Sequence, residues 1–194
     1  MHVAPIFTLP FVIPFWIVFF FAFVREGRVI QGSFATAPSD QDAGTFRALV
    51  IGSPLALAAA IAASFLPWLT IPWPEVAVAL GMALLVAGAV LRRLCFNALG
   101  KWFTGTVIVV RDQAIIQHGP YRFIRHPSYT AAFLMFIGIG LALCSWISLA
   151  ILFFAHCHLY GRRVAVEERA LLDTLGTPYR DYMSRTRRFI PFVI

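Results

Sequence analysis

Long blocks of apolar residues without charge constrain this chain more than any other feature of its sequence. A helix needs about 20 mainly apolar residues to cross a bilayer, and five blocks reach or approach that length. Charged residues make up only 13% of the chain, about half the share of a typical soluble domain. The sequence therefore predicts an all-α integral membrane protein, with residues 1–194 forming a single domain. The five predicted transmembrane helices lie at roughly residues 6–24, 48–67, 74–94, 128–144 and 146–160.

The last two blocks are separated only by Ser145 and Trp146, so we expect them to form a helical hairpin. The helical pattern of the fifth block continues beyond the predicted membrane boundary. Gly176 and Pro178 then supply a stop signal. The sequence therefore predicts one long helix that begins at Trp146 and ends at Leu175.

The positive charges predict how the spans are oriented. All sixteen Lys and Arg residues lie within residues 25–47, within 92–127 or after residue 160. The first six residues, the loop at 68–73 and the turn at 145–146 contain none. With five spans these two groups fall on opposite faces, and the positive-inside rule places the N-terminus outside the cell membrane and the C-terminus in the cytoplasm. This distribution accounts for the net charge of +7 without a nucleic-acid partner.

Residues 119–130, GPYRFIRHPSYT, place several polar side chains at the edge of a charge-free run. Proline suits the first turn of a helix, so we expect His126 at the N-cap, with Ser128 and Tyr129 in the first turn. The free N–H groups at such a helix start attract carboxylates. From the residues alone, plainer roles stay open: a simple cap for His126 and interfacial aromatics for Tyr121 and Tyr129.

The long helix carries a second group of polar residues. His156, Tyr160, Arg163 and Glu167 follow the i, i+4, i+7, i+11 pattern and therefore share one face. A solvated face with Arg163–Glu167 pairing explains Glu167 and Glu168 equally well. His156 and His158 point to different faces, so no metal site is predicted.

Further alternatives and exclusions follow from the remaining motifs. Arg122, Arg125 and Arg162 fit plain topology-setting arginines. The chain has no GxGxxG after a strand and no GxxxxGK[ST], so a nucleotide-like cofactor would not use a Rossmann domain. Around Arg111 and Asp112, residues 95–127 predict a short hairpin or an irregular loop. Residues 32–44 are interpreted as a polar cytoplasmic loop.

The order of these motifs is itself informative. GPYRFIRHPSYT, an apolar hairpin and RxxxEE followed by LGTPYRDYMSRTRRFIP together resemble the isoprenylcysteine carboxyl methyltransferase family, which is related to phospholipid methyltransferases. The resemblance covers roughly residues 106–192 and is to a prokaryotic member. It implies that residues 95–194 form the cofactor-binding and catalytic half, whereas the three spans in residues 1–94 match only in hydropathy.

The resemblance implies a membrane enzyme that uses S-adenosyl-L-methionine at its cytoplasmic side. Its acceptor would be lipophilic, an isoprenylcysteine-like carboxylate that enters from the bilayer among membrane lipids. Arg163 matches the arginine that faces the acceptor carboxylate, and Glu167 matches an acid that contacts the cofactor. The cofactor-binding residues implied are Gln113, Ala114, Ile115, Ile116, His118, Tyr121, His126, Pro127, Ser128, Tyr129 and Glu167, with no metal.

Other functions stay open. A phospholipid amine N-methyltransferase would need a base such as Glu167 or His126, because an amine must lose a proton before it attacks. An NADPH-dependent sterol-type reductase would need extra cations for the 2′-phosphate. A transporter would normally carry polar residues near mid-bilayer, whereas here they cluster at one predicted face.

Overall fold

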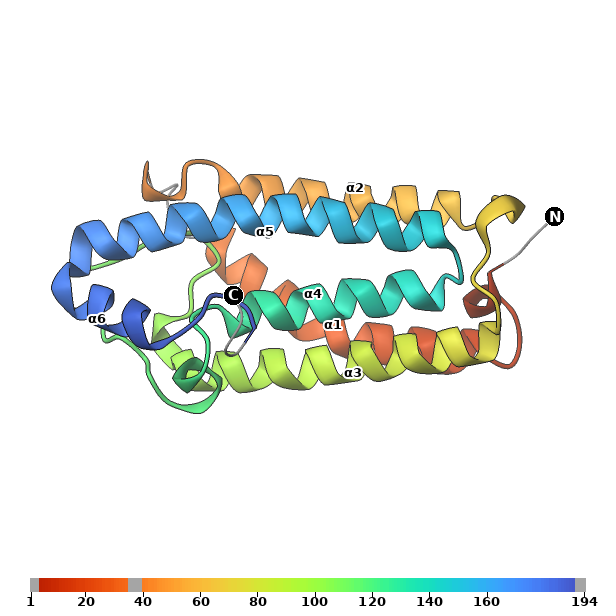
Figure 1. Cartoon of the computed structure of the whole chain (residues 1–194), viewed down its shortest axis with the longest axis horizontal. Helices are drawn as coiled ribbons and strands as arrows, with labels where there is room; N and C mark the ends of the chain where they lie inside the picture. Colours follow the sequence, from red (N-terminus) through yellow and green to blue (C-terminus); the bar gives the residue numbers. More distant parts are fainter. Residues whose placement is uncertain (1–3, 35–39, 191–194) are drawn as a thin grey trace.

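The computed structural model describes residues 4–34 and 40–190, and these residues fold into helices without a strand. The long helices pack side by side as a bundle (Figure 1). The connection between α4 and α5 lies at the same end of the bundle as the turn before α1, and α6 lies at the opposite end. The helices are α1 (Val12–Phe34), α2 (Thr45–Ala63), α3 (Pro74–Leu99), α4 (Pro127–Ala142), α5 (Trp146–Leu175) and α6 (Thr177–Arg185).

Short 3₁₀ turns precede or follow several of these helices. Proline at the first or second position opens three of them, where its missing N–H leaves no helical hydrogen bond unmade. The turns are η1 (Pro5–Phe7), η2 (Asp40–Asp42), η3 (Pro67–Leu69), η4 (Gly100–Trp102) and η5 (Gly119–Arg122). Between η4 and η5 the backbone forms neither helix nor strand among the described residues, which agrees with the irregular loop that the sequence allowed.

Two helices are long and apolar enough to cross a membrane by length and hydropathy, Thr45–Ala63 and Pro74–Trp102. In the most apolar stretch of the first helix, only 11% of the residues are buried inside the protein, and in that of the second helix 28% are buried. Most of their apolar residues therefore face outward, unlike those of a core helix in a soluble protein. Val12–Phe23 and Pro127–Ala142 are shorter apolar helices, so the count of five spans stays a prediction.

The prediction for the fifth block is confirmed in its bounds, because α5 begins at Trp146 and ends at Leu175. Ser145 caps this helix by accepting a hydrogen bond from the backbone N–H of Ser148 at 3.3 Å. Along its first half, α5 packs against α2, where the Ser148 hydroxyl donates to the carbonyl of Ala60 at 2.7 Å. Its second half extends beyond α4 toward α6 (Figure 1).

Glycines let α3 and α4 approach closely. A Cβ placed on Gly81 would lie 2.5 Å from the carbonyl oxygen of Gly138, and one on Gly138 would lie 2.5 Å from the oxygen of Gly81. Further along, a Cβ on Gly88 would lie 2.6 Å from the carbonyl oxygen of Ala131. The backbones therefore touch where the sequence offers only small residues, as in other membrane helix pairs.

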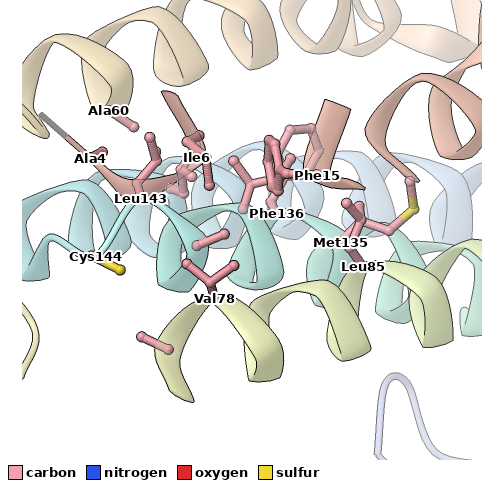
Figure 2. Packing of buried hydrophobic residues seen from close by; sticks show 14 of the residues in the cluster. Ala4, Ile6, Phe15, Ala60, Val78, Leu85, Met135, Phe136, Leu143 and Cys144 are labelled. Carbon is pink, nitrogen blue, oxygen red and sulfur yellow. The ribbon is translucent and has the colours of Figure 1, made fainter. Parts of the chain in front are cut away.

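Large buried side chains fill the space between these helices (Figure 2). Phe15 from α1, Leu85 from α3 and Met135 from α4 are almost fully buried in one cluster. Phe136 of α4 belongs to the same cluster, and its ring stacks on His156 of α5 at 3.6 Å between centroids. This core fixes α4 and α5 relative to the first three long helices, and so fixes the end of the bundle that carries the polar residues.

Candidate functional site

A cavity of about 550 Å³ opens at the end of the bundle nearest α6. Its volume lies within the range of sites for small molecules and cofactors, roughly 300 to 1,000 Å³. All six α-helices and the irregular segment after α3 contribute to its wall. One group of lining residues is aromatic or aliphatic and comes from the apolar helices: Phe19, Phe23, Leu49, Val50, Leu57 and Phe136.

The second group of lining residues is polar, and three of its members form a hydrogen-bonded row. Arg163 Nε donates to the Tyr129 hydroxyl at 3.1 Å. The Tyr129 hydroxyl in turn donates to Glu167 Oε2 at 2.7 Å. Arg163 and Glu167 are one turn apart on α5, as the sequence predicted, but Tyr129 of α4 bridges them in place of a direct pair.

Arg163 is buried, with only 3% of its surface exposed, and all three of its guanidinium nitrogens donate hydrogen bonds. Nη1 donates to the carboxylate of Asp42 and to the Thr45 hydroxyl. Nη2 donates to the carbonyl oxygen of Gly105. Residues just before and at the start of α2, together with one after α3, thus hold the arginine against the cavity wall.

Glu168 follows Glu167 in the sequence, but its side chain does not line the cavity. It is buried, with 4% of the residue exposed. Its Oε1 accepts from Arg125 Nε at 3.0 Å and lies 3.2 Å from His126 Nε2. Its Oε2 accepts from Arg188 Nη2 at 2.7 Å. This carboxylate therefore joins α5 to the start of α4 and to the C-terminal segment.

These contacts set the ionisation of Glu168. Burial alone would raise the pKa of its carboxyl, but hydrogen bonds from His126, Arg188 and Arg125 lower this pKa to about 2. Glu168 is therefore a carboxylate at any physiological pH. The interpretation of Glu168 as part of a solvated helix face is wrong, because the side chain lies inside an ion-paired cluster.

The C-terminal segment reinforces the same region through its backbone. Arg125 N–H donates to the carbonyl oxygen of Arg187 at 2.7 Å, and His126 N–H donates to that of Arg188 at 3.0 Å. The Thr130 hydroxyl donates to the carbonyl oxygen of Phe189 at 2.9 Å. His126 is the N-cap of α4, but its side chain makes no capping hydrogen bond and instead lies between the two glutamates.

The structure brings most of the predicted site residues together around this cavity. Those that line it are Gln113, Ala114, Ile115, Ile116, Tyr121, His126, Ser128, Tyr129, Arg163 and Glu167. His118 and Pro127 do not line it: His118 is exposed at the N-cap of η5, and Pro127 is buried in the first turn of α4. Residues 113–116 form neither helix nor strand.

The sequence did not indicate several polar residues that line the cavity or contact a residue that lines it. Arg92 of α3 lines the wall and donates to the Ser128 hydroxyl at 3.0 Å. Thr106 lines the wall and is buried, and no hydrogen bond engages its hydroxyl within the described part of the chain. Asp42 lies in a segment interpreted as a polar loop, yet it is 6% exposed. Neither spacing nor flanking motifs distinguish these positions, because they meet the site only through the tertiary fold.

The donor set around the cavity fits an organic ligand that carries charges of both signs. Glu167 offers a carboxylate, Arg92 and Arg163 offer cations, and Tyr129 and Thr106 offer hydroxyls. No group of three or more His, Cys, Asp or Glu side chains is arranged to hold a metal ion within residues 4–34 and 40–190.

Comparison with known proteins decides the family. Residues 79–173 match the model of the isoprenylcysteine carboxyl methyltransferase (ICMT) family. This range contains the start of α4, Arg163 and both glutamates. The matched segment, just under half of the chain, belongs to this family. The ICMT match covers most of α3, all of α4 and most of α5, which supply most of the polar cavity wall, and leaves α1, α2 and α6 outside it.

Relatives of known sequence bear similar names. A probable protein-S-isoprenylcysteine O-methyltransferase of Oryza sativa subsp. indica is 29% identical over 115 residues, which are 58% of this chain and 60% of the rice protein. The protein-S-isoprenylcysteine O-methyltransferase of Saccharomyces cerevisiae is 30% identical over 116 residues, 59% of this chain and 48% of the yeast protein. The chain thus matches about half to three-fifths of the length of these ICMT relatives.

The fold is shared with a solved structure of an ICMT. The eukaryotic intramembrane Ras methyltransferase ICMT superposes with a TM-score of 0.61 at 23% sequence identity. The superposition covers 77% of this chain and 62% of the other. Together with the outward-facing apolar helices, this likeness identifies the protein as an all-helical membrane protein of the ICMT fold.

Proposed function

We propose that this protein transfers a methyl group from S-adenosyl-L-methionine to the carboxylate of a lipophilic, isoprenylcysteine-like acceptor. The observation that carries the proposal is that one cavity has both a polar wall, at Glu167, Tyr129 and His126, and an apolar wall, between α1, α2 and α4. A charged methyl donor needs a polar surface and a lipophilic acceptor needs an apolar one, and the two surfaces must adjoin for the methyl group to be transferred. Family membership supports the same reaction.

The proposal includes a membrane arrangement. All five long apolar segments cross the bilayer, α4 and α5 as a hairpin, with the N-terminus outside and the α6 end in the cytoplasm. The concentration of arginines at the α6 end supports this orientation. The acceptor then enters the cavity from the lipid between the apolar helices, while the cofactor enters from the cytoplasm. Residues 1–94 contribute the apolar wall and residues 95–194 the polar wall of one domain.

The residues that would hold the cofactor are those of the polar wall. Glu167 would accept hydrogen bonds through Oε1, because Tyr129 already engages Oε2. The segment Gln113–Ile116 would pack along the adenosine end, and Thr106 would offer its hydroxyl. Bound S-adenosyl-L-methionine would supply an electrophilic methyl group on a positively charged sulfur.

The protein's own contribution is orientation and shelter from water. A carboxylate acceptor is ionised at pH 7, so no base is required. Arg163, held against the wall, would direct the acceptor carboxylate toward the donor. Alignment of two reactants can contribute several kcal/mol to catalysis. The aromatic wall at Phe19, Phe23 and Phe136 keeps the reacting groups in an apolar environment.

Calorimetric titration of the purified full-length protein in detergent with S-adenosylhomocysteine tests this proposal. We expect the wild type to bind, and Glu167→Ala to weaken binding by about 10- to 100-fold through loss of a charge-assisted hydrogen bond. His126→Ala should weaken binding as well, and Asp173→Ala is the control, because Asp173 is an exposed carboxylate on the same helix. A wild type that binds no S-adenosylhomocysteine contradicts the proposed function, and unchanged affinity in both site variants contradicts the assignment of Glu167 and His126.

A further inference from the structure

Asp42 contacts the site from a part of the chain that the ICMT match does not cover. It ends the short turn η2 before α2, outside residues 79–173. Despite the polar sequence around it, its side chain is buried, with 6% of the residue exposed. A buried carboxylate far from the matched segment requires a structural or functional reason, because desolvation of an unpaired charge is costly.

The carboxylate of Asp42 is held by donors from three separate segments. Oδ1 accepts from the backbone N–H of Val107 at 3.0 Å and from the Thr45 hydroxyl at 3.2 Å, and it pairs with Arg163 Nη1. Oδ2 accepts from the backbone N–H of Phe46 at 2.9 Å. Burial opposes ionisation, but these backbone donors and Arg163 lower the pKa of Asp42.

The anchoring of Arg163 fixes the direction of the hydrogen-bonded row. With Nη1 on Asp42 and Thr45 and Nη2 on Gly105, the guanidinium plane is fixed and Nε is left to donate to Tyr129. Because the Tyr129 hydroxyl accepts from Arg163, its own proton is available for Glu167. Glu167 Oε2 is then engaged, and within the described residues no hydrogen bond occupies Oε1.

We propose that Asp42 is a positioning residue for the active site, acting through Arg163 and Tyr129 on the Glu167 carboxylate. The inference rests on the proposed methyltransferase function. Asp42 holds Arg163 at the wall where donor and acceptor meet, and it pairs with the buried guanidinium charge. The N-terminal half of the chain thereby supplies a residue on which the geometry of the matched half depends.

Gln41 provides a matched control. Its Oε1 accepts from the backbone N–H of Val109 at 2.8 Å, so Gln41 ties the same two segments together, but through Val109 rather than through Arg163. If Asp42 only fastened these segments, loss of either side chain would have similar effects. If Asp42 positions Arg163, only the loss of Asp42 disturbs the hydrogen bonds from Arg163 through Tyr129 to Glu167.

The kinetic test measures methyl transfer from S-adenosyl-L-methionine to N-acetyl-S-farnesylcysteine by full-length variants in detergent. We expect Asp42→Ala to lower kcat/KM about 100-fold, as a displacement of about 1 Å in a reacting geometry can do, and Gln41→Ala to stay within about 3-fold of the wild type. In a Tyr129→Phe background, Asp42→Ala should lose most of its effect, because the path to Glu167 is already broken. Equal losses in Asp42→Ala and Gln41→Ala, or effects of Asp42→Ala and Tyr129→Phe that simply multiply, contradict the positioning role.

Two further measurements test the inference if Asp42→Ala does not fold or if the wild type shows no methyl transfer. If Asp42→Ala does not fold, Thr45→Val serves instead, because it removes the hydroxyl that accepts from Arg163 Nη1 with little change in side-chain shape. We expect this variant to lose about 10-fold in kcat/KM. An unchanged kcat/KM contradicts the inference. The Arg163 Nε–H resonance, assigned with Arg163→Lys, should shift in Asp42→Ala and not in Gln41→Ala. This readout needs no substrate, so an unshifted resonance contradicts the positioning role, whereas a wild type without methyl transfer contradicts the proposed function instead.

Discussion

Glu167 and Glu168 are adjacent on α5, yet a rotation of about 100° per helical residue places them in different surroundings. The Glu167 side chain is 30% exposed and lines the cavity, where it accepts from Tyr129. Glu168 is buried among Arg125, His126 and Arg188. We infer that Glu167 binds the ligand, whereas Glu168 stabilises the fold.

This division of roles predicts different effects on stability. Glu168→Ala should lower the free energy of unfolding by about 3 to 5 kcal/mol, because it leaves the partly buried Arg125 without its carboxylate. Glu167→Ala should cost only about 1 kcal/mol, the value of one hydrogen bond. Thermal unfolding of both variants in the same detergent checks this expectation, and equal shifts of the unfolding midpoint would contradict it.

The pKa of Glu168 predicts a dependence of stability on pH. This pKa is lowered from 4.5 to about 2 in the folded protein, so the contribution of Glu168 is complete above pH 4.5 and is lost as the pH falls through 2. The shift corresponds to about 3 kcal/mol. Across this window the wild type should lose more stability than Glu168→Gln, which cannot titrate at this position. Parallel curves for the two proteins would show that the carboxylate does not carry this effect.

The individual residues were predictable to different degrees. Arg163, Glu167 and Tyr129 stand in motifs with helical spacing, so the sequence alone placed them at one end of two neighbouring helices. Asp42 offered no such signal, because a polar segment before a helix usually faces solvent. Its partner Arg163 lies more than a hundred positions away in the sequence, and only the packing of α2 against α5 brings them together.

Among the elements, the helices were the most predictable part of the chain. Continuous apolar periodicity and the stop signal at Gly176 predicted α5 to the residue, and Pro127 marked the start of α4. The third span extends further than its apolar block, to Leu99, because the polar residues after 91 continue the helix beyond the apolar region. The path of residues 103–118 was not predictable, since side-chain contacts with Asp42, Gln41 and Arg163 determine it.

The α3–α4 pair provides a test at this scale. Gly138→Ala should lower the unfolding midpoint, at a cost of about 1 to 3 kcal/mol for overpacking, because the new Cβ would lie 2.5 Å from the backbone oxygen of Gly81. Gly161→Ala on α5 is the control: nothing lies within 4 Å of its Cβ, so the change should be neutral or slightly stabilising. Thermal unfolding of both variants in detergent compares them, and an unaffected Gly138→Ala would contradict the close backbone contact.

In the whole molecule, two halves of different character share one cavity. The matched half brings the polar residues of α4 and α5 to the α6 end, and the N-terminal half adds apolar wall from α1 and α2 together with Asp42. Hydropathy predicted the helices of the N-terminal half but not their part in the site. An arrangement of this kind brings a charged donor and a lipophilic acceptor into contact, which is the central claim of the proposed function.

Transfer of a labelled methyl group from S-adenosyl-L-methionine to N-acetyl-S-farnesylcysteine by the purified protein tests that claim most directly. Alkali releases the methyl group of a carboxyl ester as volatile methanol, whereas a methyl group on an amine nitrogen stays bound. We expect the label in the acceptor to be released by alkali, and its amount to fall in Glu167→Ala when S-adenosyl-L-methionine is below saturation. No transfer to the isoprenylcysteine, or transfer of an alkali-stable label to phospholipid amines, would contradict the assignment of a carboxyl methyltransferase.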